Sequence, residues 1–404
     1  MASVLVLGTF DTKGAEYAFA VELLRSAGVD VTLADVGILG DPPFVPDFTA
    51  DQVAAEAGID RAALAAARDR GTAVTEMAAA ASALVRRLHV AGETQAAFAL
   101  GGTGGTSLAA QAFRELPLGV PKLIVSTAAS GETSQYIAES DLVLTPSIVD
   151  IAGVNRISAQ VISNGVAALV GMLTADRPQL PDGKPLVAAS MFGVTTDCIS
   201  TSRGLLDALG YETLTFHMTG TGGRALESLV RNGAFTGVLD ITTTELADEL
   251  VGGVFSAGPG RLTAAARTGT PQVVSVGALD MVNFGPKDTV PGQFRHRNLY
   301  VHNSSVTLMR TTPDECAELG RRLAERVSAA VGPSVVLLPL RGISAIAVEG
   351  GPFHAPAADA ALFDAVRSNL SGSQTELVEI DAAVNDESFA RTAVSTLHEL
   401  IAST

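Results

Sequence analysis

The chain has 404 residues, and this length favours two domains, because a single core rarely grows beyond about 250–300 residues. Hydrophobic residues make up 47% of the chain and charged residues 17%, a composition that excludes a disordered protein. The formal net charge of −16 argues against duplex nucleic acid as a partner, since its phosphates are bound by basic surfaces.

The N-terminus and the two cysteines indicate the compartment. The segment MASVLVLG has no basic residue before its short apolar run, so it is interpreted as a first strand and not as a signal peptide. The sequence lacks a continuous apolar run of about eighteen residues, which predicts that no helix spans a membrane. Cys198 and Cys316 form neither a disulfide framework nor a metal-ligand spacing. We therefore expect a cytoplasmic protein with no membrane partner.

Strands and helices alternate in the first part of the chain. Continuous apolar runs predict buried strands, and longer amphipathic segments predict helices. The expected strands are 3–8, 29–37, 96–102, 121–127 and 141–147, and the expected helices are 12–27, 60–69, 73–91, 105–115 and 155–173. This alternation predicts a parallel sheet with helices on both faces.

The segment TADRPQLPDGKP at 174–185 is the expected linker, and the same alternation restarts after it. The expected strands are 186–193, 213–220, 235–242, 271–278, 334–340 and 375–381, with helices at 195–209, 222–232, 244–251, 260–267, 313–331, 357–369 and 386–402. Residues 280–310 are expected to be irregular. The predicted fold class is α/β, with two tandem Rossmann-like domains at 1–178 and 184–404, the first of which binds a nucleotide.

Three polar or glycine-rich turns follow strands of the first domain: GTFDTKG, GGTGGT and STAASG. The carboxyl ends of parallel strands share one edge of a sheet, so we expect these turns to converge. Glycine turns at helix N-termini bind phosphate through backbone N–H groups, although a tight turn that only packs a helix on a sheet is the alternative. The expected binding residues are Asp11, Thr12, Lys13, Gly101, Gly102, Thr103, Gly104, Gly105, Thr106, Ser126, Thr127, Ser130 and Gly131.

Several motifs make the chain recognisable. The segments GTFDTKGAE, GGTGGT, STAASGETSQYI and HNSSVTLMRTT resemble the ATP-binding family typified by the inhibitory N-terminal domain of the tomato mosaic virus resistance protein. The resemblance covers essentially the whole chain and implies two Rossmann-like subdomains, ATP in the first, and self-association. A Mg²⁺ ion accompanying ATP would be held by phosphates and by a carboxylate such as that of Asp11.

The second domain contains several residues whose side chains are suited to catalysis or to ligand binding. Residues 277–305 are expected to form a long loop, and such loops often bind ligands. The catalytic candidates are His302, His354, Arg341 and Lys287, and Arg295, Arg297 and Arg341 suit a carboxylate or phosphate. One hypothesis is a ligase- or kinase-type reaction of ATP with a small carboxylic acid in the cleft between the domains. Another is a non-catalytic nucleotide-binding module for a protein partner.

The segment GTGGRA at 220–225 offers a further alternative. It fits a dinucleotide fingerprint, follows an expected strand, and precedes Asp240, which would bind a ribose hydroxyl. An NAD(P)-binding oxidoreductase is therefore an alternative function, although a glycine turn that only connects a strand to a helix explains this pattern more simply.

The helix expected at 155–172 bears on assembly. Its apolar residues cover more than one face, and its polar residues are mostly uncharged. We expect a homodimer or a dimer of dimers, with burial of this helix inside the protein as the alternative.

Overall fold

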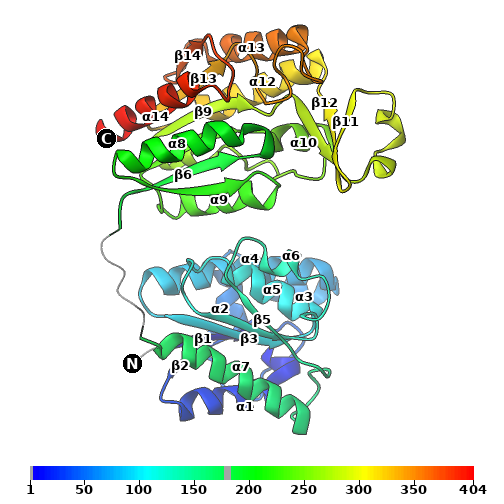
Figure 1. Cartoon of the computed structure of the whole chain (residues 1–404). Coiled ribbons are helices and arrows are strands. Elements are labelled where there is room, and N and C mark those ends of the chain that lie inside the picture. Colours follow the sequence, from blue (N-terminus) through cyan, green and yellow to red (C-terminus); the bar gives the residue numbers. More distant parts are fainter. Residues whose placement is uncertain (1–2, 177–182) are drawn as a thin grey trace. The chain divides into compact units, whose positions relative to one another are not determined.

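A computed structural model describes residues 3–176 and 183–404, and the chain forms two compact units, Met1–Gln179 and Leu180–Thr404 (Figure 1). Residues 177–182 of the predicted linker lie outside the described residues. Both units contain a parallel sheet with helices on both faces, so the predicted fold class is confirmed.

The first unit contains a five-stranded sheet of order β2-β1-β3-β4-β5, with every neighbouring pair parallel. Its strands are β1 (Ser3–Gly8), β2 (Asp30–Asp35), β3 (Ala96–Gly101), β4 (Lys122–Ser126) and β5 (Val143–Pro146). Its helices are α1 (Phe10–Ser26), α2 (Ala50–Ala55), α3 (Arg61–Ala67), α4 (Arg70–Val90), α5 (Thr103–Phe113), α6 (Ser134–Ile137) and α7 (Arg156–Thr174). The short helices α2 and α6 were not expected from the sequence.

Alternate residues of the central strands face opposite helical layers. In β1, Leu5 and Leu7 belong to the core beneath α4 and α5, whereas Val4 and Val6 belong to the core beneath α1 and α7. Successive strand residues point to opposite faces, so a strand covered on both sides is apolar throughout. This explains why the continuous apolar runs located the strands.

The second unit contains a six-stranded parallel sheet of order β14-β13-β9-β8-β6-β7. Its strands are β6 (Leu186–Met191), β7 (Glu212–His217), β8 (Gly237–Thr242), β9 (Gln272–Gly277), β13 (Ser334–Pro339) and β14 (Glu376–Ile380). Its α-helices are α8 (Thr196–Ala208), α9 (Thr221–Arg231), α10 (Glu245–Val251), α11 (Ala264–Thr268), α12 (Pro313–Ser328), α13 (Pro356–Leu370) and α14 (Glu387–Ala402). Its first five strands in chain order repeat the spatial order of the first sheet.

The prediction of an irregular segment at 280–310 was wrong. The strands β10 (Met281–Phe284), β11 (Leu299–Asn303) and β12 (Val306–Arg310) form an antiparallel sheet of order β10-β12-β11. Short 3₁₀ turns at Lys287–Thr289 and Gly292–Phe294 connect β10 to β11. Much of β11 is exposed, so it lacks the apolar pattern that revealed the other strands.

Helix α7 is the one described helix that is long and apolar enough to cross a membrane by length and composition alone. Its inner residues Ile162, Val166 and Leu169 are buried in the core shared with β3 and β4. Such packing is typical of a core helix in a globular domain. Its outer face carries Ile157, which is 47% exposed.

Candidate functional site

A cavity of about 780 Å³ lies at the carboxyl ends of β1 and β3 in the first unit. In a sheet of order 2-1-3-4-5, the chain direction across the sheet reverses between the first and third strands. The loops after these two strands diverge to opposite faces and leave a crevice, which is where open α/β sheets bind ligands. The predicted residues that line it are Asp11, Thr12, Lys13, Gly101, Gly102, Gly104 and Gly105.

The glycine turn after β3 leads directly into α5, with Gly102 as the N-cap residue. The N–H groups of Thr103, Gly104 and Gly105 belong to the first turn of the helix, so they have no carbonyl partner within it. The first intrahelical bond runs from the Thr106 N–H to the Gly102 carbonyl, at 2.9 Å. The turn therefore presents free donors and the positive end of a helix dipole.

None of the four glycines of this turn is required by the backbone conformation or by close packing. None has a positive φ. A Cβ atom on Gly102 would lie 3.7 Å from its nearest neighbour, and one on Gly104 would lie 3.5 Å from the guanidinium of Arg70. Glycine in a helix is less stable than alanine by about 0.5–1 kcal/mol. The fold itself does not explain four glycines here, but the close approach of a ligand would.

Asp11 and Lys13 lie at the start of α1. The Asp11 carboxylate accepts a hydrogen bond from the Leu39 N–H at 2.8 Å, while its Oδ1 atom is buried without a hydrogen-bond partner. The carboxylate packs so closely on Gly37 that a Cβ atom there would lie 2.5 Å from its carbon. The Lys13 ammonium donates to the Ile151 carbonyl. Lys13 has three donors, so two remain for a ligand.

Arg68, Asp69 and Arg70 also line the cavity, and sequence reasoning missed them. Arg68 and Asp69 form the turn between α3 and α4, and Arg70 is the first residue of α4; Arg68 adopts a left-handed conformation with φ of 52°. Asp69 caps α4 by accepting hydrogen bonds from the Thr72 hydroxyl and the N–H groups of Thr72 and Gly71, which lower the pKa of its carboxyl. The cap fixes the start of α4, and thereby Arg70, beside the glycine turn.

The rest of the cavity wall is largely apolar. It is contributed by the loop after β2 and by α3, α4 and α5, through Val36, Ile38, Leu39, Leu64, Ala65, Ala73, Val74, Met77 and Leu108. A crevice with cationic groups, a glycine turn and an apolar wall suits a ligand that has an anionic part and a flat apolar part.

Six predicted binding residues do not line this cavity. Thr106 and Ser126 are fully buried, and their hydroxyls lie 2.6 Å apart in a hydrogen bond that joins α5 to β4. Thr103 is exposed at the start of α5, Thr127 is half-buried, and both Ser130 and Gly131 are exposed in the turn after β4. The role of these six residues in ligand binding stays a prediction.

Comparison with known proteins places the chain in a family. Residues 2–178 match the N-terminal domain of an uncharacterised protein family (UPF0261), and residues 184–401 match its C-terminal domain. The chain belongs to the UPF0261 family. A UPF0261 protein of Clostridium tetani is 44% identical over 96% of both chains, and one of Rhizobium meliloti is 43% identical over 99% of both.

A plant relative is much longer. The ToMV resistance protein Tm-1(GCR237) of Solanum lycopersicum is 41% identical over 98% of this chain, which spans 55% of the plant protein. Among solved structures, a UDP-N-acetylglucosamine 2-epimerase from Rickettsia bellii matches 68% of this chain and 78% of its own, at 10% identity and a TM-score of 0.24. That likeness is too weak to carry an argument about function.

The catalytic candidates of this UPF0261 chain lie in the second unit, where Lys287, His302, Arg341 and His354 are all exposed. Both Nε and Nη2 of Arg341 donate to the Asp381 carboxylate at 2.6 Å. None of the four lines either of the two cavities described for residues 3–176. Their catalytic role, and a second ligand beside them, stay predictions.

Two further arginines were expected to bind an acid. The guanidinium of Arg297 holds Glu315 at 2.7 Å and the Arg310 carbonyl at the same distance. That of Arg295 approaches the Val290 carbonyl, at 3.5 Å. Arg297 is therefore occupied by the fold of the antiparallel sheet.

The second glycine turn is already occupied by a side chain of the protein. Glu245 accepts hydrogen bonds from the N–H groups of Gly220 and Gly223, at 2.7 and 3.1 Å. Its carboxylate is so close that a Cβ atom on Gly223 would lie 1.9 Å from it. These are the donors that a dinucleotide pyrophosphate would need.

Asp240 is also unavailable to a dinucleotide. Both of its carboxylate oxygens accept hydrogen bonds from Arg261, at 2.5 and 2.6 Å, and both residues are buried. Asp240 is on β8, which is separated from β7 by β6, whereas the fingerprint needs adjacent strands. The NAD(P) alternative therefore does not fit the structure.

Arg261 is the centre of this buried network. Burial acts against its charge, but Asp240, Glu245 and Glu227 together raise its pKa well above the usual value. Glu227 in turn accepts hydrogen bonds from the N–H groups of Leu262 and Ala264. The network ties α9, β8 and α10 to α11, and no single motif in the sequence indicates it.

Proposed function

We propose that the first unit binds ATP at the carboxyl ends of β1 and β3, with the phosphates on the glycine turn Gly101–Gly105. The observation that carries this proposal is the combination of open glycines with free helix donors beside a crevice of about 780 Å³. A bound phosphate would accept hydrogen bonds from the N–H groups at the start of α5.

Cations on two sides of the turn support a phosphate ligand. Arg70 lies against Gly104, and Lys13 lines the same cavity from α1. A guanidinium can hold a phosphate with two parallel hydrogen bonds, and an ammonium adds a point charge. These side chains would compensate the charge of a triphosphate in a chain whose net charge is −16.

The apolar wall and the unpartnered oxygen of Asp11 would bind the other parts of Mg·ATP. The wall formed by Ile38, Leu64, Val74 and Met77 would bury the adenine ring. A Mg²⁺ ion fits the unpartnered Oδ1 atom of Asp11 as one oxygen ligand, with phosphates and water as the others. No described group of three or more His, Cys, Asp or Glu forms a metal site by itself, so the ion would depend on the nucleotide.

ATP binding is compatible with two activities, and a turnover assay distinguishes them. A ligase or kinase would release ADP, AMP or pyrophosphate only when its small carboxylic acid is present. A non-catalytic module would bind ATP and present a surface to a protein partner. Steady-state ATP consumption with pooled small carboxylic acids tests the enzyme, which a flat response to every pool would exclude.

Binding is tested by calorimetric titration with Mg·ATP of the whole chain and of Gly104→Val. A valine at this position would project into the cavity, so binding should be lost while the fold is retained. The matched control is Gly204→Val, because Gly204 also lies in a helix but is exposed, and a Cβ atom there meets nothing within 4 Å. If the Gly104 variant binds Mg·ATP with unchanged affinity, the nucleotide site lies elsewhere.

We also propose that the protein is a homodimer or a dimer of dimers in the cytoplasm. Support comes from α7, whose outer face has no charged residue between Ile157 and Thr174. Light scattering tests the assembly, since a mass of 41.3 kDa at every micromolar concentration would refute it.

A further inference from the structure

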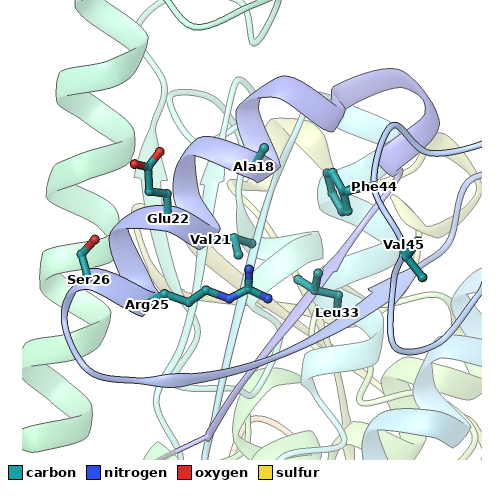
Figure 2. A pocket seen from close by; sticks show the side chains of 8 residues that line it. All are labelled: Ala18, Val21, Glu22, Arg25, Ser26, Leu33, Phe44 and Val45. Carbon is teal, nitrogen blue, oxygen red and sulfur yellow. The ribbon is translucent and has the colours of Figure 1, made fainter.

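A second cavity of the first unit lies beside α1, under the loop that follows β2 (Figure 2). Its volume is about 520 Å³, a size typical of small-molecule sites. Apolar side chains supply much of its wall, namely Val21 of α1, Leu33 of β2, and Phe44 and Val45 of the loop. It shares no lining residue with the cavity at the glycine turn.

The loop over this recess is anchored on both sides. On one side, Pro43 packs on Gly14, where a Cβ atom would lie 2.3 Å from the proline ring, and the Phe44 ring lies 5.0 Å from that of Phe10. On the other side, Asp47 accepts a hydrogen bond from the Leu33 N–H at 2.8 Å. The recess is therefore formed before any ligand arrives, which lowers the entropic cost of binding.

Two features of the recess are unusual for a bare protein surface. Val45 is 90% exposed at its edge, although burial of a valine side chain stabilises a protein. Ala18 is the smallest side chain of the wall, and with Val21 and Arg25 it occupies one face of α1 at helical spacing. A larger residue at position 18 would fill the space.

Arg25 provides the only cation in the lining of this recess within residues 3–176. Its guanidinium extends toward Leu33, whereas the Glu22 carboxylate points away (Figure 2). No ion pair or hydrogen bond of this guanidinium occurs within the described residues, in contrast to Arg61 and Arg87, which bind Asp51 and Glu56. A guanidinium beside an apolar wall is suited to the planar carboxylate of an amphipathic molecule.

We propose that this recess binds a monocarboxylic acid with a medium-length apolar body. The body would lie against Phe44 and cover Val45, above the buried Val21 and Leu33, while the carboxylate accepts N–H hydrogen bonds from Arg25. The recess offers one cation and no glycine turn, so a monoanion fits it and a polyphosphate does not. The inference does not depend on ATP binding.

The experiment is methyl NMR of the whole chain, labelled at valine and leucine methyl groups and titrated with octanoate. The Val21, Leu33 and Val45 methyl signals should shift and saturate, while those of Leu64 and Val74 in the other cavity should not. 1-Octanol lacks the charge and acetate lacks the apolar body, so each should bind more weakly than octanoate by about tenfold or more.

Two variants separate the two parts of the recognition. Arg25→Gln should weaken the binding of octanoate about tenfold and leave the binding of 1-octanol unchanged. Ala18→Leu should abolish the binding of both. Arg203→Gln is the matched control, because Arg203 is exposed on α8 of the second unit. The proposal is overturned if octanoate causes no saturable shift up to its solubility limit. It also fails if Arg25→Gln binds as tightly as the unaltered chain, or if Ala18→Leu still binds octanoate.

Discussion

The two glycine turns of this protein are similar in sequence, GGTGGT and GTGGRA, but their glycines meet different requirements. A Cβ atom on Gly104 would lie 3.5 Å from its nearest neighbour, whereas one on Gly222 would lie 1.9 Å from the His217 carbonyl oxygen. Gly220 also has a φ of 84°, which L side chains rarely adopt. The fold therefore needs the glycines of the second turn but not those of the first.

The turns also differ in what receives their hydrogen bonds. Gly220 and Gly223 donate to Glu245, a carboxylate of the protein itself. Within residues 3–176, the N–H groups of Thr103, Gly104 and Gly105 donate neither to a backbone carbonyl nor to the side chain of a cap residue. A glycine-rich turn thus indicates a ligand only when its glycines have room and its donors lack an internal acceptor.

The largest loss of stability is expected for a substitution of Gly222. Gly222→Ala places a methyl group on the backbone of His217, so we expect a loss of stability on the order of 3–5 kcal/mol or failure of the second unit to fold. Gly104→Ala in the first turn should be neutral or stabilising by about 0.4–1 kcal/mol. Calorimetric unfolding of both variants measures the contrast, and equal losses would remove the distinction between the turns.

Removal of the internal carboxylate should destabilise the second unit by a similar amount. Glu245→Ala leaves Arg261 with one carboxylate fewer and two glycine N–H groups unpaired, at a cost of about 3–5 kcal/mol. Acetate could supply the missing carboxylate, so it should raise the unfolding temperature of this variant more than that of the unaltered chain. Glu249→Ala on the same helix is the control, since Glu249 is half-buried and pairs with Arg322 and Arg326. Equal responses to acetate would mean that the turn does not bind carboxylate.

A second buried acid of α10 makes the stability of the second unit depend on pH. Burial raises the pKa of Asp248 from 3.8 to about 7, against hydrogen bonds from Asn283 and Phe255. Between these values the folded state holds a proton that the unfolded state releases. Stability should therefore fall as pH rises through this window, by at most about 1.4 kcal/mol per pH unit.

Asp248→Asn tests this dependence because an amide does not titrate. Unfolding temperatures measured between about pH 5 and about pH 8 should fall less steeply for the variant than for the unaltered chain. Asp207→Asn serves as the control, since Asp207 is exposed and pairs with Lys184. A parallel pH profile for Asp248→Asn would assign the dependence to another group, such as Asp280, whose pKa burial raises to about 6.

Sequence patterns located the residues that line the first cavity better than those around the second turn, for a physical reason. Asp11, Lys13 and Gly101–Gly105 directly follow apolar strands, and parallel strands bring such residues to one edge. Arg70 was missed because its place depends on how α4 packs against α5. The occupant of the second turn was missed because Glu245 and Arg261 are distant in sequence from Gly220 and each other, so only the fold brings them together. The antiparallel sheet was missed because β11 is exposed and because the buried strands β10 and β12 are short and include polar residues such as Asn283 and Arg310.

The smallest of these effects concerns the charge beside the first turn. If the Lys13 ammonium binds phosphate, Lys13→Met should weaken ATP binding by roughly 1.5–3 kcal/mol, the range for a charge-assisted hydrogen bond. Methionine keeps the length of the side chain and removes only the charge and donors. Adenosine, which has no phosphate, should bind both proteins equally in calorimetric titrations. Lys184→Met is the control, because Lys184 pairs with the exposed Asp207 in the second unit. An equal loss for adenosine would show that Lys13 acts by tethering Ile151, to whose carbonyl it donates, and that the phosphates lie elsewhere.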